Sequence, residues 1–176
     1  MADVEVLIIG AGFSGICMAI KLLQAGNTNF VVLEIKACRL GGHLVPQPLP
    51  WLSEIHRYIK NCASRHGILP HVRFNSAVSS AVWDAAAALW RVEVEHQAVV
   101  SAMDEHRWPP PPTSRTSTIS ARFVVRAIGG LHIPRQPAIK GMEKFSGPAF
   151  HSSSWDSSIS LEGKTVAVIG TGASSI

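Results

Sequence analysis

The sequence is short of charged residues, and this shortage already argues against several classes of protein. Charged residues make up 16% of the 176 residues and apolar residues 47%, a balance that allows a buried core and argues against a disordered tail. The net charge is +4, but the basic residues are scattered and form no dense block, which argues against a nucleic-acid partner. The length gives room for one compact domain and the start of a second.

Cysteine is also scarce. The three cysteines, Cys17, Cys38 and Cys62, have neither the spacing of a metal site nor that of a redox pair. An odd count without a C-x-x-C motif predicts reduced thiols in a cytoplasmic protein that binds no metal. The missing redox pair also argues against a disulfide reductase.

An uninterrupted hydrophobic run is missing as well. The apolar stretch over residues 6–23 is interrupted by Gly10, Gly12 and Gly15, and the segment before it is acidic rather than basic. A membrane span needs about 20 consecutive apolar residues, and a signal peptide begins with a basic flank. We therefore expect neither in this stretch.

The beginning of the chain instead has the pattern of a strand, a helix and a second strand. Residues 4–9 form an apolar, β-branched run typical of a buried parallel strand, and residues 13–25 have a helical pattern. A second β-rich run follows over residues 29–33. This order predicts a right-handed βαβ unit and a Rossmann-like α/β fold.

The turn between the first strand and the helix carries a nucleotide-binding motif. Gly10, Gly12 and Gly15 have the spacing of a turn that admits a pyrophosphate at the start of a helix. Glu34 closes the second strand, where a carboxylate can accept hydrogen bonds from both hydroxyl groups of a ribose. The motif therefore predicts a site for an adenine dinucleotide.

The middle of the chain predicts a helix and a small antiparallel meander. Apolar residues recur at helical spacing over residues 51–66, and short strand patterns follow over residues 71–75, 80–83 and 89–95. Residues 96–120 are rich in proline, serine and threonine, and we interpret them as a disordered linker or insertion.

Two further strands are expected in the last third of the chain. Residues 121–128 form an apolar run that ends at Gly129, and residues 165–169 form another. The second run continues into Gly170, Gly172 and Ser175, which repeats the strand and glycine-turn pattern of the first site. Two such sites are typical of enzymes that pass a hydride from a nicotinamide to a flavin.

A third motif connects the chain to a family. The segment from Phe145 to Asp156 has the form F-x-G-x-x-x-H-x-x-x-W-D, with Gly147, His151 and Trp155 at the specified positions. It resembles the fingerprint of type I Baeyer–Villiger monooxygenases, a branch of the flavin-containing monooxygenases. The resemblance extends over nearly the whole chain.

This resemblance implies an FAD- and NADPH-dependent monooxygenase. It acts on a small-molecule ketone, and one oxygen of dioxygen is inserted next to the carbonyl to give an ester or lactone. By the same resemblance, Gly10, Gly12, Gly15 and Glu34 would hold FAD, and Gly170, Gly172 and Ser175 would begin the NADPH site. Gly129, in a segment that resembles the family's link between its two nucleotide domains, would also be a cofactor-binding residue. His151 and Trp155 would couple NADPH binding to domain movement.

The resemblance also implies a division of the chain. Residues 1–140 would form the FAD-binding domain, residues 141–163 the segment between domains, and residues 164–176 the start of an NADPH-binding domain. After Gly42 the sequence departs from the family pattern and rejoins it near Pro50, so several dozen family residues are expected to be missing. We therefore expect a truncated, internally deleted chain with impaired turnover.

Two alternatives stay open beside this reading. The first is oxygenation of nitrogen or sulfur by a related flavin monooxygenase, against which the Trp155-Asp156 pair argues. The second is a non-catalytic fragment that binds FAD.

Overall fold

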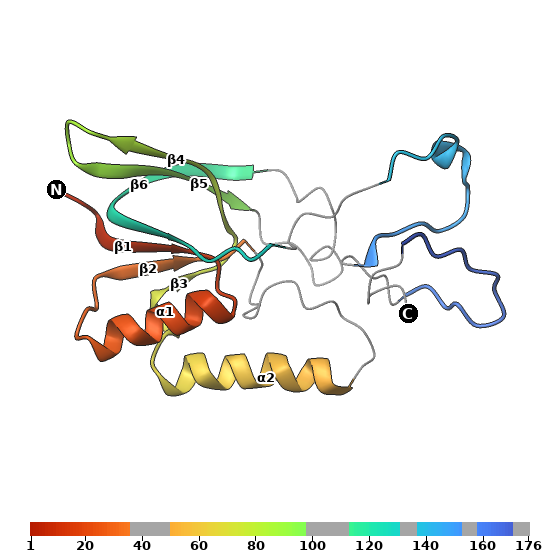
Figure 1. Ribbon diagram of the computed structural model, residues 1–176, viewed down its shortest axis with the longest axis horizontal. Coiled ribbons are helices and arrows are strands. Elements are labelled where there is room, and N and C mark those ends of the chain that lie inside the picture. Colours follow the sequence, from red (N-terminus) through yellow and green to blue (C-terminus); the bar gives the residue numbers. More distant parts are fainter. Residues whose placement is uncertain (36–49, 98–112, 131–136, 153–157, 171–176) are drawn as a thin grey trace.

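The computed structural model describes residues 1–35, 50–97, 113–130, 137–152 and 158–170. Its main body is a mixed six-stranded sheet with the strand order β3-β2-β1-β6-β5-β4, and two helices cover one face of it (Figure 1). Among the described residues, no helix is long and apolar enough to cross a membrane. In chain order the elements are β1 (Val4–Ile9), α1 (Phe13–Gln24), β2 (Phe30–Leu33), α2 (Pro50–Arg65), η1 (Leu69–His71), β3 (Val72–Arg73), β4 (Ser76–Asp84), β5 (Leu89–Gln97), β6 (Thr113–Arg126) and η2 (Met142–Lys144).

Strand β1 lies at the centre of the parallel part of the sheet. It pairs in parallel with β2 on one side and with β6 on the other. Its residues Val6, Leu7 and Ile8 are buried, as expected for a strand that is covered on both faces. The strands predicted over residues 4–9 and 29–33 are confirmed, and the second begins one residue later than predicted.

Both helices end in the same way, at a glycine. Gly26, after α1, and Gly67, after α2, have positive φ angles of 79° and 66°. The next residue donates its N–H back to the last turn: Asn27 to the Leu22 carbonyl at 2.9 Å, and Ile68 to the Ala63 carbonyl at 2.8 Å. These are Schellman motifs, which satisfy carbonyl groups that the helix itself leaves unpaired. The two predicted helices are therefore confirmed to within a residue at each end.

The sheet has a separate apolar core on each face. On one face, alternate residues of β1 and β2 pack against α1 and α2 (Val6, Ile8, Phe30 and Val32). On the other face, the residues between them pack against the antiparallel strands (Leu7, Val31 and Leu33 against Val92, Val94 and Ile119). The side chains of a strand point alternately to its two faces, so the short apolar runs of β1 and β2 supply both cores.

Strand β6 connects the two parts of the sheet, and it corrects a prediction. Its first part pairs antiparallel with β5 as far as Ala121, and from there it pairs in parallel with β1. The interpretation of residues 96–120 as a disordered linker is therefore wrong for residues 96–97, which end β5, and for residues 113–120, which lie in β6. Serine and threonine suggested a loop, but Ile119 is buried in the core while polar neighbours alternate with it. Residues 98–112 lie outside the described residues.

Of the three short strands predicted after the second helix, those over residues 80–83 and 89–95 are confirmed as an antiparallel pair, whereas residues 71–75 form only the two-residue β3, outside the meander. Strands β4 and β5 form an antiparallel hairpin that pairs Ser76 with His96 at its open end and Asp84 with Leu89 at its turn. The short β3 pairs in parallel with β2 and forms one edge of the sheet. Strand β4 forms the other edge.

The strand predicted over residues 165–169 does not form. These residues have no regular secondary structure, and Val166, Val168 and Ile169 are 50%, 64% and 62% exposed. They belong to a segment, residues 158–170, that Figure 1 shows in dark blue, apart from the sheet. A strand is stable only when neighbouring strands satisfy its N–H and C=O groups, and among the described residues nothing pairs with this one.

Candidate functional site

Three segments leave the parallel strands β1, β2 and β6 at their carboxyl ends and meet there. We call this end of the sheet the carboxyl edge, to distinguish it from the outer strands β3 and β4. β1 continues into Gly10, β2 into Glu34 and β6 into Ala127. Two hydrogen bonds hold them together: the N–H of Gly10 donates to the Leu33 carbonyl, and the N–H of Ala127 donates to the Ile9 carbonyl, each at 2.8 Å. Ligands of open α/β sheets bind at this carboxyl end of the strands.

Gly10 and Gly15 make the turn after β1 too tight for any side chain. Gly10 has a φ of 102°, and a Cβ atom there would lie 2.7 Å from the carbonyl oxygen of Ala127. A Cβ atom at Gly15 would overlap the carbonyl oxygen of Gly10. The two glycines therefore let helix α1 begin directly against β1 and let the end of β6 pass close beside the turn.

Gly12 differs from its two neighbours in the motif because it faces open space. It is the N-cap residue of α1, and a Cβ atom there would meet nothing within 4 Å. The first hydrogen bond of the helix runs from the N–H of Ile16 to the Gly12 carbonyl, so the N–H groups before Ile16 have no acceptor within the helix. No acidic side chain lies in the first turn of α1. An open surface, available N–H groups and the positive end of a helix dipole suit a phosphate group.

Glu34 is the buried acid of this edge, with only 5% of its surface exposed. Its main chain is held on both sides: its N–H donates to the Arg73 carbonyl and its carbonyl accepts from the N–H of Ser76, each at 2.9 Å. Its carboxylate atom Oε2 accepts a hydrogen bond of 2.8 Å from the N–H of Ala11. A buried carboxylate needs such a partner, and the start of α1 offers it a favourable electrostatic environment. Glu34 thereby connects the end of β2 directly to the glycine turn.

Gly129 lies three residues beyond the end of β6, on the same side of the sheet. Its φ is 68°, and a Cβ atom there would meet nothing within 4 Å. Because Gly10 contacts Ala127, the turn that contains Gly129 begins beside the glycine turn of β1. The structure thus brings five of the predicted residues to one edge (Gly10, Gly12, Gly15, Glu34 and Gly129).

The fingerprint segment lies elsewhere. Figure 1 shows residues 137–152, in lighter blue, beyond the end of the sheet. Within this segment the ring of Phe145 lies over Gly147, where a Cβ atom would be 2.7 Å from the ring atom Cζ. His151 is half-buried, and Trp155 lies outside the described residues. The ring of Phe145 is 64% exposed and can move aside, so this contact alone does not require a glycine at position 147. The predicted coupling role of His151 and Trp155 stays a prediction.

The second glycine signature is described only at its start. Gly170 has a φ of 134° and ends the described segment of residues 158–170. Gly172 and Ser175 lie outside the described residues. Their predicted place in an NADPH site stays a prediction.

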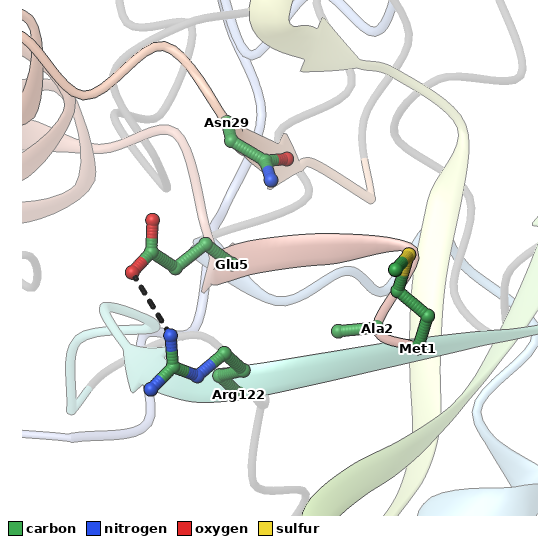
Figure 2. A pocket seen from close by; sticks show the side chains of 5 residues that line it. All are labelled: Met1, Ala2, Glu5, Asn29 and Arg122. Carbon is green, nitrogen blue, oxygen red and sulfur yellow. Dashed lines mark ion pairs between the residues drawn. The ribbon is translucent and has the colours of Figure 1, made fainter.

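A shallow hollow lies at the opposite end of β1 and is unrelated to the glycine turn. Figure 2 shows its lining side chains: Met1, Ala2, Glu5, Asn29 and Arg122. Glu5 pairs with Arg122 at 3.6 Å and also accepts a hydrogen bond of 3.0 Å from Asn27, so its charge is already compensated. Among the described residues, no group of three or more His, Cys, Asp or Glu side chains could hold a metal ion.

Comparison with known proteins relates the chain to one family. No family model matches. A Baeyer–Villiger monooxygenase of Streptomyces coelicolor is 32% identical over 98% of this chain and 34% of its own length. The polycyclic ketone monooxygenase of Thermothelomyces thermophila superposes with a TM-score of 0.80, at 26% identity, over 98% of this chain and 32% of its own. The structure of OTEMO in complex with FAD and NADP superposes with a TM-score of 0.79, at 26% identity, over 98% of this chain and 36% of its own.

Over nearly its whole length the chain is similar to one part of Baeyer–Villiger monooxygenases. It spans about a third of the length of the relatives it matches.

The comparison also supports the predicted internal gap. The match to the Streptomyces monooxygenase extends over 198 residues, although this chain has 176, so that relative has residues with no counterpart here. The departure from the family pattern after Gly42, where we expect this gap, lies outside the described residues.

The sequence did not point to two of the contacts that shape this edge. One is the carbonyl of Ala127, which approaches Gly10, and the other is the N–H of Ala11, which binds Glu34. Both are main-chain groups, and no residue type identifies them. The only signal for the first is the small residue at position 127, directly after β6.

Proposed function

We propose that this chain holds FAD at the carboxyl edge of β1, β2 and β6, as the flavin-binding part of a Baeyer–Villiger monooxygenase. The observation that carries the proposal is the hydrogen bond from the N–H of Ala11 to Glu34, beside the open surface of Gly12. It brings a carboxylate that suits a ribose next to a helix start that suits a pyrophosphate. The FAD-bound structure of OTEMO, which superposes on this chain, supports the choice of dinucleotide.

Different residues of this edge would bind different parts of FAD. The N–H groups at the start of α1 would bind the pyrophosphate, which can approach closely because Gly12 has no side chain. Glu34 would accept hydrogen bonds from the ribose while keeping its bond to Ala11, since a carboxylate has several acceptor positions. Gly129 would leave room for the cofactor at the end of β6.

The proposed reaction is that of the family. When bound, FAD reduced by NADPH would supply the chemistry that inserts one oxygen of dioxygen next to a ketone carbonyl to give an ester or lactone, with the other oxygen leaving as water. In this proposal Gly170, Gly172 and Ser175 begin the NADPH site, and His151 and Trp155 respond to NADPH. We also propose that the protein works in the cytoplasm, where its thiols would stay reduced.

Flavin binding is tested with purified chain and added FAD. After removal of free cofactor, the folded protein should keep a flavin absorption band. Glu34→Gln should weaken FAD binding about tenfold or more, because a buried, charged hydrogen-bond partner is lost. Glu143→Gln, an exposed change in η2, is the matched control and should bind like the parent. A folded parent chain that stays colourless in excess FAD would contradict the proposal.

A second candidate is FAD binding without turnover. It is favoured by the exposed, unpaired residues 165–169, where the NADPH site was predicted to begin. Oxidation of NADPH in step with conversion of a ketone to its ester would decide for oxygenation. A yellow protein that leaves NADPH untouched would decide for binding alone, and turnover of an amine or sulfide instead of a ketone would point to the related flavin monooxygenases.

A further inference from the structure

Glu34 lies one residue beyond the pairing of β2 with β3. The two strands pair only until Leu33 faces Arg73. Both main-chain groups of Glu34 are nevertheless bonded: its N–H donates to the Arg73 carbonyl and its carbonyl accepts from the N–H of Ser76, each at 2.9 Å. Residues 73–76, which we call the β3–β4 bend, therefore hold the main chain of Glu34 on both sides.

The β3–β4 bend depends on an unusual backbone conformation at Asn75. This residue has a φ of 52°, in the left-handed region that most side chains avoid. Asparagine adopts this region more readily than most other residues with a side chain. The hydroxyl of Ser76, a residue that is only 3% exposed, donates to the Phe74 carbonyl at 3.0 Å. Asn75 and Ser76 together thus let the chain pass from β3 into β4 within two residues.

A main chain held in this way also directs the Glu34 side chain, because the direction of the Cα–Cβ bond follows from it. The carboxylate atom Oε2 accepts a hydrogen bond of 2.8 Å from the N–H of Ala11. Two segments therefore position this acid: the β3–β4 bend holds its main chain and the glycine turn holds its carboxylate. A group that recognises a ligand must be held within about 0.5 Å of its productive position, and supporting contacts supply that precision.

We propose that Asn75 and Ser76 are positioning residues of the dinucleotide site, because they maintain the bend that directs Glu34 toward the ribose of FAD. The inference rests on the proposed function, in which Glu34 accepts hydrogen bonds from that ribose. It adds that the effect of both residues on binding passes through Glu34. Changes at the bend should therefore weaken recognition of the ribose hydroxyl groups and leave the rest of the cofactor site unaffected.

Two ligands separate ribose recognition from the rest of binding. They are FAD and an FAD analogue whose adenosine ribose lacks both hydroxyl groups. The parent chain should bind FAD about tenfold or more tightly than the analogue, because the analogue offers Glu34 no donor. Glu34→Gln should reduce this preference, because a neutral amide is a weaker acceptor than a carboxylate.

Asn75→Val tests the bend, because a β-branched residue resists a positive φ. The preference for FAD should fall to about threefold or less, while the affinity for the analogue changes by less than about twofold. Asn75→Gly should restore the parent's preference, because glycine adopts a positive φ without strain. A folded Asn75→Val variant with the parent's preference would overturn the inference.

Ala88 offers a matched control for backbone strain. Its φ of 51° is nearly that of Asn75, but it lies in the turn between Asp84 and Leu89. Figure 1 shows this turn at the left end of the β4–β5 hairpin, away from the end of β2. Ala88→Val should lower the stability toward denaturant about as much as Asn75→Val and yet keep the parent's preference for FAD. If both variants lost the preference equally, general destabilisation would be the cause and the positioning role would be wrong.

Ser76→Ala provides a second test that does not depend on backbone strain. Loss of the hydroxyl group removes the bond to the Phe74 carbonyl and should lower the preference for FAD by about two- to fivefold. Should Asn75→Val fail to fold, an unchanged preference in Ser76→Ala would refute the positioning role. A parent chain that binds both ligands equally, or neither, would instead contradict the proposed ribose contact of Glu34, and the inference would fall with it.

Discussion

Two segments of this chain share a strand and glycine-turn pattern but have very different structures. Residues 6–12 read Val-Leu-Ile-Ile-Gly-Ala-Gly and residues 166–172 read Val-Ala-Val-Ile-Gly-Thr-Gly. The first is a buried strand and a glycine turn that opens a helix, whereas in the second the residues up to Gly170 are exposed and have no regular structure. The local sequence therefore does not decide the outcome.

The difference lies in what surrounds each segment. β1 has a parallel strand on each side and an apolar core on each face. Residues 165–169 have neither among the described residues. A strand satisfies its main-chain groups only through neighbours, so a similar motif folds in one context and not in the other.

The largest expected effect concerns the glycine turn of the folded segment. Gly15→Ala places a Cβ atom against the carbonyl oxygen of Gly10, so the start of α1 must move away from β1. We expect a loss of about 3 kcal/mol or more in the free energy of unfolding, measured with chemical denaturant. Gly12→Ala, in the same turn but facing open space, should cost less than about 1 kcal/mol. Equal losses for the two variants would contradict the described turn.

The next effect compares the two strand sequences directly. Ile8→Ala removes a fully buried side chain from the helix-side core and should cost about 2–5 kcal/mol. Val168→Ala, in the exposed segment, should change the free energy of unfolding of the monomer by less than about 0.5 kcal/mol. Denaturation of both variants at low protein concentration checks this. A large loss for Val168→Ala would mean that residues 165–169 pack on the sheet after all.

The smallest effect lies at the start of the chain, where Asp3 is tied to β6. Its pKa is lowered from 3.8 by hydrogen bonds from the main-chain N–H and the hydroxyl of Ser120. A lowered pKa means that the charged form stabilises the fold above pH 3.8 and that this contribution is lost as the pH falls through the folded-state value. Asp3→Asn should therefore be slightly less stable than the parent near neutral pH, and the two should converge in acid. Parallel denaturation curves between pH 6 and pH 2, taken at steps of about one unit, measure the difference.

The sequence predicted most of the fold because its signals were local. Apolar runs and helical spacing located β1, α1 and α2, and glycines marked both helix ends. It failed where the outcome depended on partners. The serine- and threonine-rich residues 113–120 are a strand because β5 lies beside them, and residues 165–169 are not a strand because nothing described does.

In the candidate site, too, the sequence predicts the local features and misses those that depend on neighbouring segments. The glycines and Glu34 are visible in the sequence because the required residue types are unusual at that spacing. Their contacts with Ala11 and Ala127 use main-chain atoms, which any residue could supply. How the fingerprint residues His151 and Trp155 relate to this edge depends on long-range packing, which no local pattern specifies.

The continuity of β6 has a mechanical consequence. Strand β6 runs unbroken from its pairing with β5 to its pairing with β1, and it ends beside the glycine turn. One continuous strand therefore joins the antiparallel and parallel parts of the sheet, with no hinge between them. A displacement of the hairpin along β6 would also displace the end of β6, including the Ala127 carbonyl that lies close to Gly10. A cofactor that rigidifies the glycine turn should therefore also reduce the motion of the hairpin strands β4 and β5, although these strands do not contact the cofactor.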